Sequence, residues 1–319
     1  MSQTQKSIAV LTSGGDAPGM NAAVRAVVRA GINKGMKVYG VYRGYNGLLN
    51  GDVEEMNLRS VSDIIGNGGT MLYTARSEEY ATPAGIQRAA DFCRSIGVSG
   101  VVVIGGDGSF RGARCLTNAG INCIGVPGTI DNDIACSEYT VGFDTAMNTA
   151  IQMVDRIRDT AQSHDRCSVV EVMGRRCGDI ALQTGIATGA TAILVPEVQY
   201  NIERDVIARI INTQKTGKKH FIVVVAEGVG GVRDLAKYVE QRLGIEQELQ
   251  SSVMYSVAVL RHFVTELLQA RWALRLLNFL NRISVTELLQ CRAARLLILI
   301  STKHLICLVC LMKSFTRLL

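Results

Sequence analysis

Short runs of aliphatic and β-branched residues alternate with longer segments of mixed polarity along the chain up to about Gly244. The short runs are typical of buried strands in a parallel sheet, and the longer segments of helices that cover such a sheet. The predicted strands span residues 8–11, 38–42, 101–104, 121–126, 168–172, 192–195 and 221–225. The predicted helices span residues 22–32, 145–160, 179–188, 203–213 and 233–243, and a further helix begins at Phe110.

This alternation predicts an α/β fold made of two doubly wound, mostly parallel-sheet lobes, with the active site in the cleft between them. A chain of 319 residues is long enough for one or two domains. We expect the first lobe at residues 1–138 and the second, which is incomplete, at residues 139–246. Residues 247–319 form a C-terminal tail of different character.

The composition of the chain changes abruptly after Glu248. Residues 249–319 contain no glycine, proline or aspartate, whereas the residues before them hold all 32 glycines and all four prolines. An α/β domain needs these residues for its turns. The tail holds nine lysines and arginines and two glutamates, which gives it a net charge of +7. Because the whole chain has a net charge of +6, the residues before the tail have a net charge of −1. The body of the protein is nearly neutral, and we expect no nucleic-acid partner.

We expect a cytoplasmic protein with no membrane partner. Residues 1–6 are polar and lack the charged and then apolar pattern of a secretion signal. The apolar run at residues 296–312 is interrupted by Lys303 and His304, which makes it marginal for a membrane span. The nine cysteines show no paired framework spacing, which is typical of reduced thiols. We interpret the Cys-x-x-Cys spacing at residues 307–310 as chance.

Two glycine-containing turns follow neighbouring predicted strands. Residues 105–109 read Gly-Gly-Asp-Gly-Ser, and residues 127–133 read Pro-Gly-Thr-Ile-Asp-Asn-Asp. In open α/β sheets, ligands bind at the carboxyl ends of the strands, where these turns deliver Asp107, Asp131 and Asp133. The first motif alone is often only a turn, and the second alone is compatible with a helix cap. On adjacent strands, the two together predict a site for a magnesium-bound nucleotide and a proton acceptor.

Together with residues 11–21 (LTSGGDAPGMN), 171–175 (EVMGR) and 217–220 (GKKH), these motifs resemble those of the bacterial ATP-dependent 6-phosphofructokinases. The resemblance covers about residues 8–246, and the motifs in combination are very specific. It implies a glycolytic enzyme that phosphorylates fructose 6-phosphate at the 1-hydroxyl, with ATP as co-substrate and Mg²⁺ as cofactor. It also implies a homotetramer that is regulated by ADP or phosphoenolpyruvate.

The resemblance assigns roles to individual residues. Asp131 would act as general base toward the attacking hydroxyl, and Asp107 would hold magnesium with Asp133 organising it. Arg76 and Arg175 would donate hydrogen bonds to the developing phosphate charge. The residues assigned to ATP are Gly15, Arg76, Ser77, Gly106, Asp107, Gly108 and Ser109. Those assigned to fructose 6-phosphate are Thr129, Ile130, Asp131, Arg166, Met173, Gly174, Arg175 and Glu227, with Arg166 matching a residue that a neighbouring subunit supplies.

A basic pocket for a phosphorylated effector is also implied by the resemblance. Its residues are Arg25, Arg29, Arg59, Arg158, Gly189, Lys215, Lys218, Lys219 and His220. Two positions depart from the family pattern. The arginine expected just before Ser-Val-Ser-Asp occurs one place late, as Arg59 after Leu58, and Thr191 stands where the family has a glutamate suited to bind a metal. We therefore expect altered regulation.

Without the family pattern, the arginines and the glutamate have ordinary interpretations. Arg166 and Arg175 would be solvated surface arginines, as most arginines are. Glu227 would merely end the strand predicted at residues 221–225. The family pattern favours a functional role for all three.

Two glycines favour ATP over pyrophosphate as the phosphoryl donor. Pyrophosphate-dependent relatives carry aspartate where Gly108 stands and lysine where Gly128 stands, and a carboxylate at position 108 would repel the α-phosphate of ATP. A nicotinamide-dependent oxidoreductase is an alternative, but the third glycine of its loop is misplaced at Gly112. No Gly-x-x-x-x-Gly-Lys-Ser/Thr loop of a Walker-type NTPase is present.

We interpret residues 247–319 as the product of reading the gene out of frame. The third base of each codon from Ser251 to Arg261 can be read together with the first two bases of the following codon. The codons allowed for these residues then permit the sequence Leu-Gly-His-Val-Gln-Arg-Gly-Gly-Ser-Pro, which resembles the family's next substrate-binding motif. One adenine restored after the codon of Glu246 turns Gln247 and Glu248 into Thr-Arg and supplies a missing substrate arginine. The alternative function is therefore a non-catalytic, nucleotide-binding product of a frameshifted phosphofructokinase gene.

Overall fold

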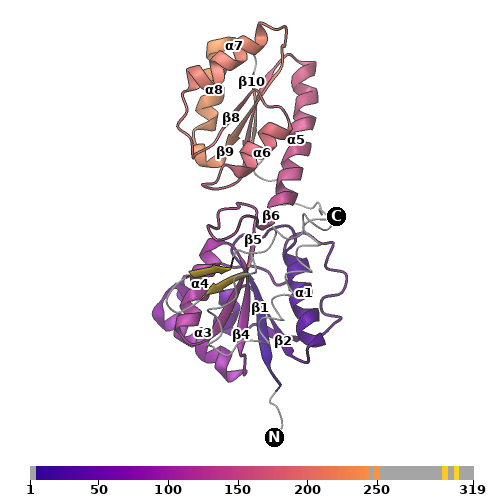
Figure 1. Ribbon diagram of the computed structural model, residues 1–319, viewed down its shortest axis with the longest axis vertical. Coiled ribbons are helices and arrows are strands. Elements are labelled where there is room, and N and C mark those ends of the chain that lie inside the picture. Colours follow the sequence, from indigo (N-terminus) through magenta and orange to yellow (C-terminus); the bar gives the residue numbers. More distant parts are fainter. Residues whose placement is uncertain (1–4, 245–246, 252–296, 301–304, 309–319) are drawn as a thin grey trace, which may run out of the picture. The chain divides into compact units, whose positions relative to one another are not determined.

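The computed structural model describes residues 5–244, 247–251, 297–300 and 305–308 (Figure 1). These residues form two compact α/β units. The first unit contains the chain as far as Thr129, Ile134–Gly142 and the two C-terminal strands. The second contains Ile130–Asp133 and the chain from Phe143 through the strand at Gln247–Ser251.

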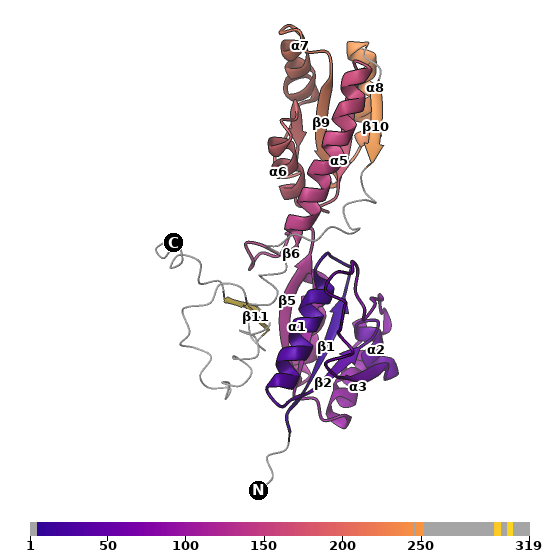
Figure 2. The same ribbon diagram turned by 90° about the vertical axis from the view of Figure 1, so that its right-hand side faces the viewer.

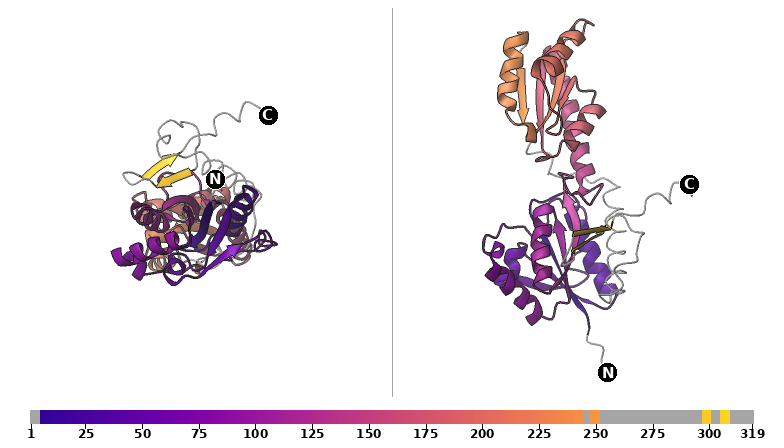
Figure 3. Two further views of the ribbon diagram at one scale, coloured as in Figure 1. Left: turned by 90° about the horizontal axis from the view of Figure 1, so that it is seen from below. Right: turned by 60° about the vertical axis from the view of Figure 1, so that its left-hand side comes forward.

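The first unit is built on a mixed sheet. Its strands in the described chain are β1 (Ser7–Ser13), β2 (Lys37–Val41), β3 (Val53–Met56), β4 (Gly100–Gly105), β5 (Asn122–Thr129), β6 (Val141–Gly142), β11 (Leu297–Ile300) and β12 (Leu305–Leu308). Their order is β12-β11-β5-β4-β1-β2-β3, with β6 paired to β5. The central strands β5, β4, β1 and β2 are parallel, whereas β3, β11 and β12 pair antiparallel. The yellow strands β11 and β12 extend the β5 side of the sheet (Figure 3).

Helices cover both faces of this first sheet. They are α1 (Met20–Asn33), α2 (Tyr45–Asn50), η1 (Glu79–Ala81), α3 (Pro83–Ser95) and α4 (Asp107–Asn118). β1 is buried along its whole length, and its alternate residues face opposite layers. Leu11 belongs to the core that includes residues of α2, α3 and α4, whereas Ile8 faces Gly31 of α1. Figure 2 shows α1 and the α2–α3 pair on opposite sides of β1 and β2.

The second unit is built on a parallel sheet. Its strands are β7 (Cys167–Val172), β8 (Ala192–Leu194), β9 (Phe221–Ala226) and β10 (Gln247–Ser251), in the order β10-β7-β9-β8. Its helices are α5 (Phe143–Ser163), α6 (Asp179–Ala187), η2 (Glu203–Ile207), α7 (Ala208–Gln214), η3 (Glu227–Val229) and α8 (Val232–Leu243). Val169 and Val223 join a core with residues of η2, α7 and α8, while α5 and α6 pack against each other and against β9.

The α/β class with mostly parallel sheets is confirmed, and each predicted strand and helix corresponds to an observed one. Two predicted boundaries at the ligand-binding edge of the first sheet are wrong. α4 begins at Asp107 rather than at Phe110, because an acidic residue is favourable in the first turn of a helix. β5 continues through Pro127 to Thr129, because its last residues still pair with β4 and β6.

The hydrophobic pattern did not predict α2, α3, β3 and β6, nor the short helices η1 and η3. For α3 a sequence signal exists: Thr82 accepts a hydrogen bond of 3.1 Å from the N–H of Gly85, and Pro83 occupies the first position of the helix. The helix predicted over residues 203–213 begins as the π-helical turn η2 and continues as α7.

The tail is only partly described. Gln247–Ser251 adds a parallel strand beside β7, and β11 and β12 form an antiparallel pair. The remaining residues of the predicted out-of-frame tail lie outside the described part of the chain. Among the described residues, no helix is both long and apolar enough to cross a membrane. The cysteines from Cys93 to Cys177 are free thiols.

Candidate active site

The carboxyl ends of β1, β4 and β5 meet at one edge of the first sheet. In the parallel register Ser13 lies beside Gly105, and Gly105 lies beside Pro127. The turn that contains Gly15 follows β1, and the first turn of α4 (residues 107–109) follows β4. This is the edge at which open α/β sheets bind ligands.

The backbone at this edge is packed too closely for a side chain at Gly105. A Cβ there would clash with the carbonyl oxygen of Ser13 and lie 2.5 Å from Ser109 Oγ. Ser109 Oγ donates a hydrogen bond of 2.8 Å to that same carbonyl and so joins α4 to β1. A Cβ at Gly106 would lie 3.6 Å from Thr129 Cβ, so Thr129 of the second motif borders the start of α4.

The first turn of α4 presents backbone N–H groups, and the preceding Gly106 has no side chain to cap them. The first amides of a helix lack partners within the helix, and the helix dipole makes this end electropositive. Gly108 in this turn is exposed, and a Cβ there would have no neighbour within 4 Å. This open, electropositive backbone suits a phosphate group.

Asp107 fits a magnesium ion that is bound together with a phosphate. Asp107 Oδ2 forms an ion pair of 2.7 Å with Arg111 Nη2, one turn along α4, and both side chains are exposed. An exposed ion pair contributes at most about 1 kcal/mol, so this carboxylate remains available to a cation. In the described chain, no group of three or more His, Cys, Asp or Glu residues is arranged to hold a metal. Mg²⁺ is commonly held by one or two carboxylates plus substrate phosphates, which is the set that Asp107 offers.

The other residues assigned to ATP lie in the same unit. Gly15 is exposed, with no atom within 4 Å of a Cβ built on it. Ser77 Oγ accepts a hydrogen bond of 3.2 Å from the backbone N–H of Tyr80. Arg76 is exposed in the segment before η1, and the arginine that pairs with Asp107 is Arg111 rather than Arg76. The role of Arg76 in phosphoryl transfer stays a prediction.

In the second unit, Asp131 and Asp133 share one guanidinium. Arg175 Nε lies 3.8 Å from Asp131 Oδ2, and Arg175 Nη1 lies 3.9 Å from Asp133 Oδ2. The side chain of Asp131 is 12% exposed, whereas that of Arg175 is 67% exposed. These distances exceed hydrogen-bond length, so the contact is ionic and leaves the N–H groups of Arg175 able to turn toward an incoming phosphate.

The backbone that carries Arg175 forms a tight turn after β7. Gly174 has a φ of +146°, and a Cβ there would clash with the carbonyl oxygen of Cys177. Arg175 itself is left-handed, with a φ of +53°. Glu227 Oε1, at the start of η3, accepts hydrogen bonds from the backbone N–H groups of Gly174 and Arg175. Glu227 therefore holds this turn in place, a role that the sequence analysis did not foresee.

Two further residues assigned to the sugar phosphate, Met173 and Arg166, lie at opposite ends of β7. Met173 follows the carboxyl end of this six-residue strand, and Arg166 precedes its amino end. Such a strand separates its ends by about 20 Å, so the structure does not bring Arg166 together with Arg175 in this chain. Ile130 is buried, and the carbonyl of Thr129 accepts a hydrogen bond of 2.7 Å from Thr140 Oγ1.

Several residues assigned to the effector gather in the second unit. Arg158 on α5 donates a hydrogen bond to the carbonyl of Thr188, which precedes Gly189. Burial lowers the pKa of His220, and the positive charges of Lys218 and Arg158 lower it further. Four of the assigned residues thus lie close to one another, and together they form a cationic cluster (Arg158, Gly189, Lys218 and His220).

The other assigned residues of this unit are less closely associated with the cationic cluster. Lys219 Nζ forms an exposed ion pair of 3.7 Å with Asp165, and Lys215 is exposed after α7. Thr191, which replaces the family glutamate, has a buried Oγ1 without a hydrogen bond among the described residues.

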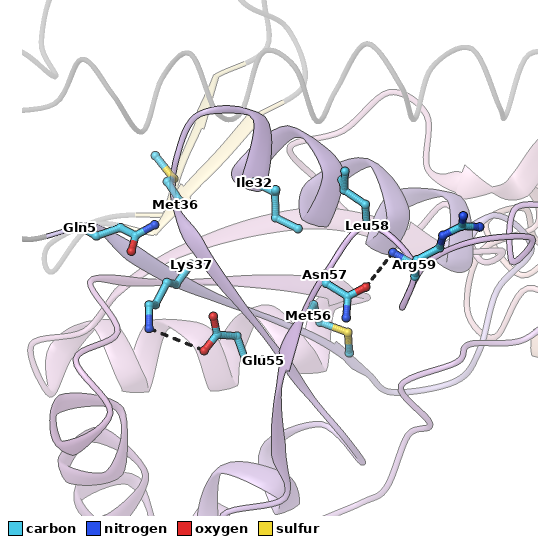
Figure 4. A pocket seen from close by; sticks show the side chains of 9 residues that line it. All are labelled: Gln5, Ile32, Met36, Lys37, Glu55, Met56, Asn57, Leu58 and Arg59. Atoms are coloured by element: carbon cyan, nitrogen blue, oxygen red, sulfur yellow. Dashed lines mark hydrogen bonds and ion pairs between the residues drawn. The ribbon is translucent and has the colours of Figure 1, made fainter.

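The effector residues of the first unit are only partly brought together. Arg25 and Arg29 lie one turn apart on α1, whereas Arg59 follows β3. Arg59 lines a pocket of about 500 Å³ together with Ile32 near the end of α1 and Met36 between α1 and β2, but Arg25 and Arg29 do not line it. Figure 4 shows Arg59 at one end of this pocket and the Lys37–Glu55 ion pair at the other.

The two glycines that favoured ATP differ in their surroundings. Gly108 faces open space, as described above, whereas Gly128 is buried. A Cβ at Gly128 would lie 3.0 Å from Ile104 Cγ2 and 3.4 Å from Met20 Cε. A side chain at position 128 would therefore require Ile104 or Met20 to move by a few tenths of an ångström.

Known proteins similar to this chain are phosphofructokinases. A family model described as "Phosphofructokinase" matches residues 7–263. An ATP-dependent 6-phosphofructokinase of Clostridium botulinum is 58% identical over 241 residues, which are 76% of this chain and 75% of that protein. The enzyme of the same name from Clostridium tetani is 56% identical over 240 residues, 75% of each chain.

Solved structures agree with these matches. Phosphofructokinase from Saccharomyces cerevisiae superposes with a TM-score of 0.82 at 33% identity, covering 88% of this chain and 42% of the yeast chain. A pyrophosphate-dependent phosphofructokinase from Marinobacter aquaeolei has a TM-score of 0.74 at 22% identity and covers 86% of this chain and 76% of that chain, which shows a shared fold. From the motifs, the α/β architecture and these similarities, the chain belongs to the phosphofructokinase family.

Proposed function

We propose that the body of this chain is an ATP-dependent 6-phosphofructokinase. It would transfer the terminal phosphoryl group of ATP to the 1-hydroxyl of fructose 6-phosphate, yielding ADP, fructose 1,6-bisphosphate and one proton. The observation that carries the proposal is the largely buried Asp131 carboxylate paired with the exposed Arg175 guanidinium. A carboxylate beside a cation offers a proton acceptor and a group that donates hydrogen bonds to phosphate at one place.

Phosphoryl transfer requires chiefly positioning and neutralisation of charge. Asp131 would accept the proton of the 1-hydroxyl as its oxygen attacks phosphorus. Arg175 would turn its N–H groups from the two carboxylates toward a phosphate, and Glu227 would keep the backbone of Arg175 in place by its two hydrogen bonds. Arg76 would add a second guanidinium against the transferring phosphate.

The first unit would hold the nucleotide. The first turn of α4 and Gly15 offer backbone amides to phosphate oxygens. Asp107 would hold magnesium, which when bound neutralises charge on the phosphate oxygens. The absence of a carboxylate at Gly108 and the close packing of Gly128 against Ile104 and Met20 support ATP rather than pyrophosphate as donor. We assign residues 1–138 to nucleotide binding and residues 139–246 to the sugar phosphate.

Family membership also supports a homotetramer in the cytoplasm, with Arg166 acting in a neighbouring subunit and ADP or phosphoenolpyruvate as effector. The cationic cluster around Arg158 and His220 is the part of the effector site that is best assembled in this chain.

A second candidate is a product that binds nucleotide without turnover. It is favoured by the tail, because residues 249–319 lack the glycine, proline and aspartate that the rest of such a domain needs for turns. In this case, restoring one adenine after the codon of Glu246 would convert the chain into the active kinase.

The test measures phosphorylation of fructose 6-phosphate by ATP and by pyrophosphate, for the chain as printed and for the frame-restored chain. We expect ATP-dependent turnover in the restored chain and nucleotide binding without turnover in the printed one. In the active version, Asp131→Ser should lower kcat roughly 10²–10⁴-fold while ATP binding is retained. An unchanged rate in Asp131→Ser, or a preference for pyrophosphate, contradicts the proposed function.

A further inference from the structure

The residue between the two candidate aspartates of the second unit has a partner of its own. Asn132 Nδ2 donates a hydrogen bond of 2.9 Å to Oδ2 of Asp179, the first residue of α6. The aspartates on either side of Asn132 face Arg175 instead. All three side chains belong to one short segment, the aspartate loop (residues 130–133), which is part of the second unit. Neither Asn132 nor Asp179 is among the residues assigned to a ligand.

The backbone of the aspartate loop needs support at Asn132. This residue has a φ of +54°, in the left-handed region. Asparagine adopts this conformation more readily than most residues other than glycine, but it stays less favourable than the ordinary regions. Such a conformation persists where the surrounding structure determines it, and the hydrogen bond to Asp179 is a contact that does so.

The segment that carries Asp179 is itself well anchored. Its earlier part is bound by Glu227, as described above. The N–H of Gly178 donates a hydrogen bond of 2.7 Å to Glu197 Oε1, and a Cβ at Gly178 would lie 2.5 Å from Val195 Cβ. Residues that follow β8 and β9 therefore hold the backbone from which Asp179 presents its carboxylate.

We propose that Asn132 and Asp179 are positioning residues, whose mutual hydrogen bond holds the aspartate loop so that Asp131 stays where it can accept the proton of the 1-hydroxyl. The inference rests on the proposed function and adds two residues that act through Asp131 rather than on a substrate. A general base must lie within hydrogen-bond reach of the proton that it removes, and a misplacement of about 1 Å can lower a rate about 10²-fold.

The experiment measures kcat and the KM for ATP in Asn132→Gly, Asp179→Ala and the double variant. It uses the full chain, printed or frame-restored, that turns over fructose 6-phosphate. Glycine at position 132 removes the hydrogen bond while a left-handed backbone remains accessible. We expect each single variant to lower kcat roughly 10–100-fold and to leave the KM for ATP unchanged.

Two further variants separate the hydrogen bond from the charge. The double variant should be no slower than the slower single variant, because both substitutions remove the same hydrogen bond. Asp179→Asn should keep kcat within about threefold of the parent, because its amide oxygen also accepts a hydrogen bond.

Asp234 provides the matched control. Like Asp179 it is an acidic residue in the first turn of a helix of the second unit, but it is exposed and lies on α8. Asp234→Ala should lose the same favourable interaction with a helix dipole and leave kcat unchanged. Hydrogen–deuterium exchange of the amides of residues 131–134 gives a second measurement, which should be faster in Asp179→Ala and unchanged in Asp234→Ala.

The inference is overturned if Asn132→Gly or Asp179→Ala has the kcat of the parent, because the loop then keeps its position without this hydrogen bond. It is also overturned if the losses simply add in the double variant, if Asp179→Asn is as slow as Asp179→Ala, or if Asp234→Ala is equally slow. Failure of every version of the chain to turn over, or an unchanged rate in Asp131→Ser, overturns the proposed function and the inference with it. A slow Asp131→Ser beside a fully active Asp179→Ala overturns the inference alone.

Discussion

At the scale of the residue, the candidate site depends on positions where a side chain is missing. Gly105 permits β4 to approach Ser13 and Ser109, and Gly112 permits Tyr45 to pack on the backbone of α4. Gly174 permits the tight turn that presents Arg175. At each of these positions a Cβ would meet a neighbouring atom too closely, so the reason for glycine is steric and independent of any ligand.

Gly108 and Gly128 give a prediction on donor choice. Gly108→Asp should leave the free energy of unfolding within about 0.5 kcal/mol of the parent, because the site is open and a carboxylate is favourable in the first turn of a helix. It should weaken ATP binding about tenfold or more, because the new charge faces the phosphates. Gly128→Lys should instead lower the free energy of unfolding by about 1–3 kcal/mol through overpacking against Ile104.

Urea denaturation and calorimetric titration with an ATP analogue measure these two quantities for both variants. A Gly128→Lys protein as stable as the parent, or a Gly108→Asp protein with full ATP affinity, would show that these glycines do not set the donor through steric room and charge.

At the scale of the element, Arg158 of the cationic cluster connects α5 to the residues that follow α6 in the second unit. Arg158 on α5 donates to the carbonyl of Thr188 after α6, and its charge reaches His220, which precedes β9. The pKa of His220 responds to three neighbouring charges. The positive charges of Lys218 and Arg158 lower it, and the negative charge of Asp165 raises it. A phosphorylated effector would add negative charge to this cluster.

This arrangement predicts the direction in which the pKa of His220 moves. In the free protein it lies below the usual 6.5, so the imidazole is mostly neutral at pH 7. Bound ADP should raise this pKa, because a phosphate stabilises the protonated ring. Arg158→Met should also raise it, without ligand, by removing a positive charge.

NMR titration of the imidazole resonances with and without ADP measures both shifts, and the exposed His164 provides the control signal. A pKa of His220 that ADP leaves unchanged would remove the cationic cluster from the effector site. Because the folded form binds a proton on His220 less readily than the unfolded form, this residue also costs stability as the pH falls below about 6.5.

At the scale of the whole molecule, the chain consists of a body that matches phosphofructokinases and a tail of unlike composition. The C. botulinum relative aligns over 241 residues and leaves a quarter of its own length unmatched. The tail is rich in leucine, carries a net charge of +7, and holds no glycine or proline. If the reading frame is shifted, the apolar faces that the natural C-terminal part would cover are left to solvent.

We therefore predict that the printed chain aggregates more than the frame-restored chain. Exposed apolar surface promotes association during and after folding. Sedimentation velocity at equal concentration measures this difference, with the restored chain expected as a homotetramer. A printed chain that sediments as a single well-defined species and turns over fructose 6-phosphate would contradict the frameshift interpretation, as would resequencing that finds no missing base at the codon of Glu246.

The sequence by itself determined the α/β class and pointed to the strand ends at which the candidate site lies. Buried parallel strands are continuous apolar runs, and Gly-Gly-Asp-Gly-Ser after one of them marks a ligand edge, so periodicity and glycine positions were sufficient. The tertiary structure alone decided which side chains meet. Four contacts each join residues more than forty positions apart in the sequence. They are the ion pairs of Arg175 with Asp131 and Asp133, the hydrogen bond from the Arg175 N–H to Glu227, and the hydrogen bond from Tyr45 to Ser109. Such pairs leave no periodic trace in the sequence, because they arise from strand order and helix packing, which only the folded chain establishes.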